Sequence, residues 1–579
     1  MVWLTHCNRG SGLKPTDIKR PAGQETDDDE GIYEEEGNLP SDNLLSPQSP
    51  PLVDALVPAK QNAVFVKILD KIERDNCTAQ RQGQPTIRFI TSKEYLKIIN
   101  NAFEVNLKDD AFAGILPAET VVLGYDHLRD FNLASPEKLK TLMQANQTVA
   151  KSIEQAQFQG ATQCGKAAEA CLQDWLTQTL PLLWQGDVSA DVIKKEADAF
   201  KARGGDQAAF GQTIERLLLS PYFLYRQKIG GSGRLTDWEV ATTLSESLWD
   251  MPVDRNLKTL VDNKGLSNPT AVANQAKAMI QSPNFYRGLK RFVSSWLEHE
   301  DLTMKDYTEV QNFNFSDSMK TDLVNETAGF LYYMLRANND SLSQIFSANF
   351  TMGTPGMAQQ FGLTAAPAQV VPGLPQGFAQ LSFPEGRQGL LSQPSVVMGM
   401  SDTSKTNPAL RGKHVLSRFL CHNLETPENL QDVVANTKFD PTVSVKQAFQ
   451  NVTSSGTCAE CHQYVNGVGF GMENISPVGL VRAMDDHSQP VDAAGELLTL
   501  SGKRLEFSGV AGLSKTLGTT IDAEVCMVVQ VFRMVHGRLE KEEDTCSIAE
   551  SYKKSKASGF RFHEIFTNVI LDDAYLNRK

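Results

Sequence analysis

Apolar side chains recur at three- and four-residue intervals along much of the chain, which is the spacing of helices that bury one face. Thr236 and Glu239 begin one such stretch with a capping pair, and Gly537 ends another at the place of a C-terminal cap. Five stretches show the pattern: 212–226, 236–248, 285–297, 319–335 and 522–535. The spacing therefore predicts a mainly α protein.

Patterns of other kinds are few. Val121–Leu123 is a short β-branched run that predicts a strand. Residues 347–388 are rich in glycine and proline and predict a long ordered loop with short helices.

The length and the local composition predict several domains. A chain of 579 residues is long enough for about four. Residues 25–36 hold eight acidic side chains, and a Pro- and Ser-rich stretch follows, so this region cannot bury a core. We expect the following segments: an acidic tether at 1–60, N-terminal helical modules at 61–232, a central helical module with a long loop at 233–385, a small domain at 386–490, and a C-terminal helical module at 491–579.

The charge and the ends of the chain limit its partners. The net charge is −13, and no basic run is present, which argues against nucleic acid. No run of about 18 apolar residues predicts a transmembrane helix. The first residues resemble no signal peptide, although Cys7, at the start of the tether, is a candidate lipid anchor if the signal sequence has been cut short.

One short motif carries explicit chemistry. Cys458-Ala459-Glu460-Cys461-His462 is the C-x-x-C-H signature of covalent c-type haem attachment. Cys458 and Cys461 would form thioethers with the two vinyl groups, and His462 would be the proximal iron ligand. The alternatives are a redox dithiol, or a zinc site that Cys421 and His422 complete. The motif predicts one haem c in a small domain at 386–490, similar to a c-type cytochrome, in the C-terminal third.

The residues around this motif resemble a known family, the planctomycete-cytochrome-associated multi-domain proteins. The resemblance runs from about residue 85 to 579 and rests on these segments: Leu218–Arg226, Arg387–Leu391, Thr406–Lys413, Gly469–Asn474, Pro477–Gly479 and Cys526–Cys546. It implies a large exported protein, in a family of mostly unknown function. Asn466-Gly467 stands where the family usually has Asp-Pro, which predicts a looser loop beside the haem.

The sixth iron ligand would separate an electron carrier from a haem enzyme, because a Met or His ligand saturates the iron and an open position permits chemistry on a substrate. The sequence leaves this ligand open. Its candidates are Met398, Met400, Met472, Met484, His487, Met534 and His536.

The remaining cysteines predict structural disulfides. Cys526 and Cys546 lie 20 residues apart around the end of a helix, and we expect a bridge between them. Cys164 and Cys171 would lie about 10 Å apart in an unbroken helix, so their bridge requires a bend, which Gly165 could supply. Cys77 and Cys421 would pair with each other or stay reduced.

These observations predict an exported monohaem c-type protein that transfers electrons, in the periplasm or at the cell surface, with an unidentified redox partner. Two alternatives remain. One is a haem oxidoreductase with an open sixth position, and the other is a cell-surface binding or structural protein in which the motif holds zinc or a structural group.

Overall fold

We describe a computed structural model of the protein. It gives the placement of residues 59–77, 83, 86–112, 115–228, 233–307, 310, 313–367, 370–424 and 437–578. Cys7 and nearly all of the predicted tether lie outside these residues. The described chain is mainly α-helical, as predicted, with four small antiparallel sheets.

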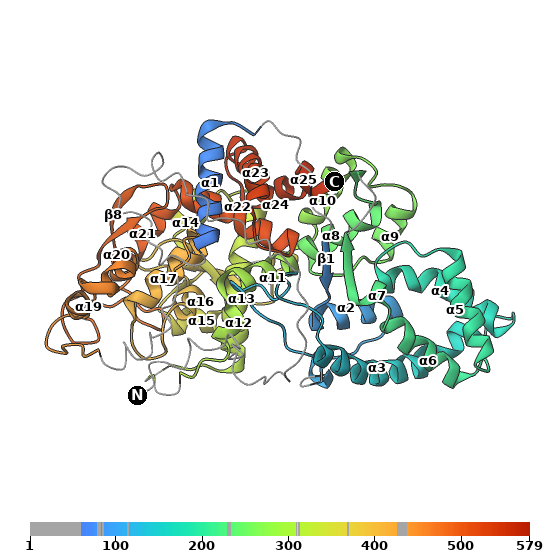
Figure 1. The fold of residues 1–579 in the computed structure, drawn as a ribbon. Coiled ribbons are helices and arrows are strands. Elements are labelled where there is room, and N and C mark those ends of the chain that lie inside the picture. The colour runs from blue at the N-terminus through green and yellow to red at the C-terminus, as the bar shows by residue number, and fades with distance from the viewer. Residues whose placement is uncertain are drawn as a thin grey trace, which may run out of the picture.

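The N-terminal part contributes one helix near the C-terminal elements and an arm of helices at the right of Figure 1. Its elements are α1 (Ala59–Arg74), β1 (Thr86–Phe89), α2 (Ser92–Phe103), η1 (Asp109–Phe112), α3 (Pro136–Thr162), α4 (Ala168–Trp184), α5 (Ala190–Ala202), α6 (Gln207–Leu218), α7 (Pro221–Leu224) and β2 (Tyr225–Lys228).

The helix that follows residue 236 begins with the predicted capping pair. The Thr236 side chain accepts from the Glu239 backbone amide, and the Glu239 carboxylate accepts from the Thr236 amide. Its elements are β3 (Gly233–Arg234), α8 (Asp237–Trp249), α9 (Arg255–Asp262), α10 (Pro269–Gln281), α11 (Phe285–Leu297), α12 (His299–Leu302), α13 (Asp317–Arg336), α14 (Leu342–Ser347), β4 (Phe350–Gly353), α15 (Pro355–Gln360), β5 (Thr364–Ala365) and β6 (Ala379–Ser382).

The C-terminal half holds the C-x-x-C-H motif on α20, at the left of Figure 1. Its elements are η2 (Leu390–Ser392), α16 (Pro394–Gly399), α17 (Pro408–Phe419), α19 (Val445–Thr453), α20 (Gly456–Phe470), β7 (Ala494–Leu498), β8 (Arg504–Ser508), α21 (Gly509–Leu517), α22 (Ile521–His536), η3 (Glu542–Asp544), α23 (Thr545–Ala557), α24 (Phe562–Ile570), α25 (Asp573–Leu576) and β9 (Asn577–Arg578). Gly537 caps α22 with a φ of 60°, as predicted.

Two local predictions are wrong. Val121–Leu123 is no strand: only Val122 pairs, with Tyr125 across a tight turn, and Leu123 has a φ of 50°. The predicted loop at 347–388 contains a three-stranded sheet in the order β4-β6-β5 beside the short helix α15. Its strands are too short to show an alternating pattern in the sequence.

Most buried apolar side chains form one cluster that extends from α1 to α25, so the successive segments share a core. A smaller cluster lies under the β4-β6-β5 sheet and includes Leu323, Met357, Leu381 and Met398. No helix among the described residues has the length and apolar character that a membrane crossing requires.

Three disulfides join the described cysteines. Cys164–Cys171 is confirmed, and Gly165, with a φ of 82°, makes the bend that the bridge needs. The predicted Cys526–Cys546 bridge is wrong, as is the prediction that Cys77 pairs with Cys421 or stays reduced. Cys546 pairs with Cys77 instead, because α1 packs on α23, and Cys526 pairs with Cys421.

Candidate haem-attachment site

The motif helix α20 packs closely on α17 because glycines line their contact. A Cβ atom on Gly412 would lie 2.0 Å from the Val465 carbonyl oxygen, and one on Gly469 would lie 1.9 Å from the Pro408 oxygen. No other residue type fits at either position without moving backbone. Segments 406–413 and 469–474, which carry part of the family resemblance, therefore meet in space.

Arg411 fixes the turn that follows α20. Its side chain is fully buried, and its Nη1 donates to the carbonyl oxygens of Met472 and Ile475, each at 2.8 Å. Its Nη2 donates to the Ser476 oxygen at 3.1 Å, and Glu473 lies 3.5 Å away as its counter-ion. This network holds the carboxyl end of the motif helix in one position.

The structure brings Cys458, Cys461 and His462 together on the first two turns of α20. Helical geometry places the three side chains within an arc of roughly 100°. Cys458 and Cys461 are half-buried and, of the described cysteines, they are the two outside disulfides. Burial, followed by the neighbouring Glu460 and Cys458, raises the pKa of the Cys461 thiol, while Lys413 opposes this shift.

Three linked hydrogen bonds, each sharing a residue with the next, fix the His462 ring. Nδ1 of His462 lies 2.8 Å from Oδ1 of Asn466, Nδ2 of Asn466 donates to Thr453 Oγ1 at 2.8 Å, and this hydroxyl donates to the Phe449 carbonyl oxygen at 2.6 Å. Because a carbonyl only accepts, the hydroxyl must donate to it and accept from the amide. The donor and acceptor directions of these three hydrogen bonds therefore place the proton of His462 on Nδ1 and the lone pair on Nε2.

His462 is suited to bind a metal through Nε2. Burial lowers its pKa below the ordinary value, although the Asn466 hydrogen bond opposes the shift. The imidazole is therefore neutral at neutral pH, which is the form that coordinates metals. An acceptor on Nδ1 is the usual partner that orients a ligating histidine and raises its basicity.

A cavity of about 620 Å³ lies beside His462, between α19, α20 and the β7–β8 hairpin. Its volume is in the range of cofactor and ligand pockets, roughly 300–1,000 Å³. The rings of Phe470 and Phe507 give it apolar walls, and Lys446 and Glu496 lie at its polar side. Cys458 and Cys461 do not line this cavity, and Cys461 lies round the helix toward Lys413 on α17.

The candidates for a sixth ligand lie elsewhere. Met398, Met400 and Met472 are buried in packed clusters, and Met484 is half exposed. His487 contacts the Val443 carbonyl oxygen through Nδ1 at 2.8 Å, and Met534 and His536 line a different pocket. None of the seven lines the cavity beside His462.

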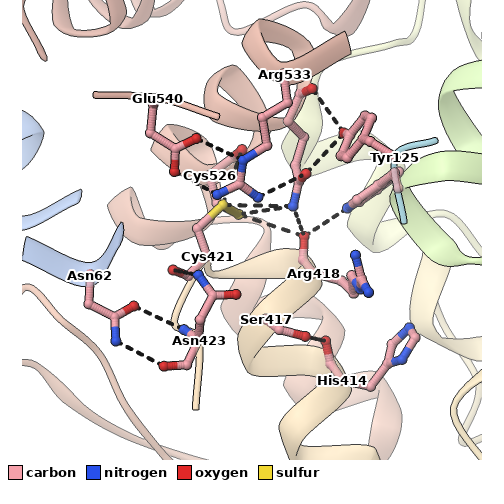
Figure 2. The surroundings of a disulfide bond; sticks show 12 residues. Asn62, Tyr125, His414, Ser417, Arg418, Cys421, Asn423, Cys526, Arg533 and Glu540 are labelled. Carbon is pink, nitrogen blue, oxygen red and sulfur yellow. Dashed lines mark hydrogen bonds and ion pairs between the residues drawn. A yellow bond between two sulfur atoms is a disulfide. The ribbon is translucent and has the colours of Figure 1, made fainter. Parts of the chain in front are cut away.

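The zinc alternative loses one of its expected ligands, because Cys421 is bonded to Cys526. Figure 2 shows this disulfide beside Tyr125, Arg533 and Glu540. Among the described residues, no group of three or more His, Cys, Asp or Glu side chains is arranged to hold a metal ion.

Sequence reasoning misjudged the surroundings of the motif. The loop predicted at Asn466-Gly467 is helix, because α20 continues to Phe470, and the missing proline is what permits this continuation. The role of Asn466 was missed, although its position four residues after His462 is a signal that the two side chains lie on one face. The cavity wall from β7 and β8 had no signal in the sequence.

Two comparisons by family model give matches. Residues 235–363 match the model PSD4, described as Protein of unknown function (DUF1592), and residues 387–485 match the model PSCyt3, described as Protein of unknown function (DUF1588). The second range contains the C-x-x-C-H motif and the contact between α17 and α20. No curated protein and no solved structure matches the chain.

Proposed function

Because the chain belongs to the planctomycete-cytochrome-associated multi-domain family, as its sequence motifs predicted, we propose that it is an exported monohaem c-type protein that transfers electrons. Cys458 and Cys461 hold the haem covalently, and His462 is its proximal ligand. A bound haem c supplies a one-electron iron couple.

One observation carries this proposal. Cys458 and Cys461 remain as thiols on one turn of α20, whereas the six other described cysteines form disulfides, and the adjacent His462 presents an unprotonated Nε2. With Cys458, Cys461 and His462 as ligands, a four-coordinate zinc site would still need one more, and a structural disulfide would leave His462 without a role.

The residues around the site favour electron transfer. Asn466 and Thr453 hold the imidazole through hydrogen bonds within α19 and α20, so the ring has little freedom to move when the charge beside it changes. Phe470 and Phe507 give the cavity beside His462 an apolar wall. A fixed ligand and an apolar wall keep the structural change between two oxidation states small.

The same cysteines support the proposal that the protein is exported. Three disulfides and a covalent haem form in the same oxidising compartments outside the cytoplasm. We therefore propose that the protein acts in the periplasm or at the cell surface.

A second candidate function, a haem oxidoreductase, is favoured by one observation. None of the seven residues named as sixth ligands lines the cavity beside His462.

Carbon monoxide separates the two functions, because it binds ferrous haem at once only where the sixth position is open. Protein matured in a cytochrome-c-competent host would be reduced and exposed to the gas. If the protein is an electron carrier, the wild type should bind little carbon monoxide. One single substitution among Met472, Met484, Met534 and His536 should then increase this binding. Immediate binding by the wild type, with all four variants unchanged, would favour the oxidoreductase.

A further inference from the structure

The Cys164–Cys171 disulfide differs from the other two in its place in the fold. It joins the turn after α3 to the first turn of α4, in the arm of helices at the right of Figure 1, whereas α20 is at the far left. Residues 163–167, which form this turn, are all exposed. In the function proposed above, the bridge serves only as a sign of an oxidising compartment.

The two cysteines of this bridge are unequally accessible. Cys164 lies in the exposed turn, whereas Cys171 is 2% exposed. A thiolate that opens a disulfide must reach one of the two sulfur atoms, and the rate depends on which sulfur it attacks. A thiolate from solvent is therefore directed to Cys164.

Cys171 is placed to leave as a thiolate. It is the fourth residue of α4, a helix of 17 residues, and helical side chains tilt toward the N-terminus, where the helix favours a negative charge. The Cys164 backbone amide also donates to its Sγ at 3.0 Å. Both features stabilise the thiolate that forms when the bridge opens, and a more stable thiolate leaves faster.

The acidic side chains closest in sequence to Cys171 are paired with lysines. Glu169 contacts Lys201, and Asp174 contacts Lys166. The pairing reduces the repulsion that these carboxylates would exert on a thiolate at Cys171.

The two helices are also held by packing, independently of the bridge. α3 packs on α6, and α4 packs on α2, α3 and α5. Ala161 near the end of α3, and Leu172 and Leu176 on α4, belong to the main core cluster. The bridge joins residues only seven positions apart, so it contributes less through loop closure than a bridge across a long loop. We therefore expect α3 and α4 to stay folded when the bridge opens.

The other two bridges lack this combination. Cys421 and Cys526 are 1% and 0% exposed, and Gln530 donates to both of their sulfur atoms within the network of Figure 2. The Cys77–Cys546 bridge is half-buried and joins residues 469 positions apart. Buried bridges, and bridges that close long loops, resist reduction because the folded state loses more stability when they open.

We propose that Cys164–Cys171 is a thiol–disulfide exchange site whose substrate is a protein dithiol. A thiolate of the dithiol attacks Cys164 Sγ, the S–S bond breaks, and Cys171 leaves as a thiolate and takes up a proton. The second thiolate of the dithiol then attacks the partner's sulfur in the mixed disulfide, and Cys164 leaves and takes up a proton. Two electrons and two protons pass to the cysteines, and the dithiol becomes a disulfide. This site is independent of the haem proposal.

The first test equilibrates the mature, full-length protein with mixtures of reduced and oxidised dithiothreitol, followed by alkylation and peptide mass mapping. We expect Cys164 and Cys171 to be alkylated at a ratio of reduced to oxidised reagent at least tenfold lower than any other bridged cysteine, with the far-ultraviolet circular dichroism unchanged. Cys458 and Cys461 are mapped separately, so the result does not depend on haem. The proposal is overturned if either of the other bridges opens earlier or within tenfold of this ratio, or if the Cys164–Cys171 bridge opens only as the helical signal is lost.

The second test identifies the attacked sulfur. A dithiol protein of the thioredoxin type, with the second cysteine of its C-x-x-C motif replaced by serine, cannot complete the exchange and stays bound as a mixed disulfide. We expect it to be trapped on Cys164. Trapping on Cys171, or no trapping, would contradict the proposal.

The double variant Cys164→Ala, Cys171→Ala is the matched control, because it keeps the other two bridges. It should retain the helical signal and trap none of the probe. Trapping as extensive as in the wild type would place the mixed disulfide on another bridge and overturn the proposal.

Discussion

His462 is held by Asn466, and this contact sets the electronic character of the proposed iron ligand. A histidine that donates from Nδ1 is a more basic ligand and stabilises the ferric state. We expect Asn466→Ala to raise the reduction potential by tens of millivolts, since about 59 mV corresponds to a tenfold change in relative affinity. A redox titration followed by optical absorption measures this shift.

Gln463→Ala is the control for that substitution. Gln463 lies next to His462 on α20, but its side chain is exposed and donates to the Glu460 carbonyl oxygen. Its loss should leave the potential unchanged. An Asn466→Ala protein with the wild-type potential would show that the hydrogen bond has no influence on the iron.

The stability of the protein should depend on pH because of the buried carboxyl of Glu326. Its carboxyl is fully buried on α13, and burial raises its pKa to about 7, although the Ser395 amide donates to it at 2.8 Å. The folded state then binds a proton that the unfolded state has released, so stability falls as the pH rises from about 4.5 to 7. In the wild type, we expect the free energy of unfolding to fall by on the order of 3 kcal/mol between pH 5 and 8. Glu326→Gln should remove this fall.

Urea unfolding at the two pH values measures this difference. Glu543→Gln, at an exposed position, should keep the wild-type dependence. If the free energy of unfolding of Glu326→Gln changed with pH as much as that of the wild type, the Glu326 carboxyl would be ionised in the folded protein.

At the scale of residues, the sequence identified Cys458, Cys461 and His462 because their chemistry depends on spacing alone. It missed Asn466 and Thr453, whose roles depend on hydrogen bonds between two helices.

At the scale of elements, the close packing of α17 against α20 predicts that a larger residue in their contact destabilises the protein. A methyl group at Gly469 would overlap the Pro408 carbonyl oxygen, so Gly469→Ala must push the two helices apart. We expect a loss of about 1–3 kcal/mol in the free energy of unfolding, as for other overpacked positions. The urea midpoint, followed by circular dichroism, measures it.

Gly160→Ala is the matched helical control. An added Cβ at Gly160, on α3, meets nothing within 4 Å, so the substitution should be neutral or stabilise by about 0.5–1 kcal/mol. Equal effects of the two alanines would contradict the close approach of α17 and α20.

Among the elements, long helices with strong periodicity were predictable. The stretches 285–297 and 319–335 became α11 and α13 with nearly the expected bounds. The strands β4 to β6 were not, because each is at most four residues long and depends on partners elsewhere in the chain. Val121–Leu123 shows the converse, since a β-branched run without a partner strand forms a turn.

For the whole molecule, the Cys77–Cys546 disulfide joins residues 469 positions apart and fixes α1 against α23. Non-reducing peptide mapping should recover the two cysteines in one linked peptide. Replacing both with alanine should lower the melting temperature more than replacing Cys164 and Cys171, because the stabilisation grows with the length of the closed loop.

The opposite order of melting temperatures would contradict this account, as would a linked peptide of Cys526 with Cys546. Such pairings could not be read from the sequence. Cys526 and Cys546 are close along the chain, but their partners, Cys77 and Cys421, follow α1 and α17, which only the tertiary fold brings near.

The central claim, that α20 carries a covalent haem, is tested most directly by the intact mass of protein matured in a cytochrome-c-competent host. The account predicts the mass of the polypeptide plus one haem, retained after acid–acetone extraction, and the polypeptide mass alone for the double variant Cys458→Ser, Cys461→Ser. Wild-type protein with the polypeptide mass alone, and with both thiols open to alkylation, would contradict it.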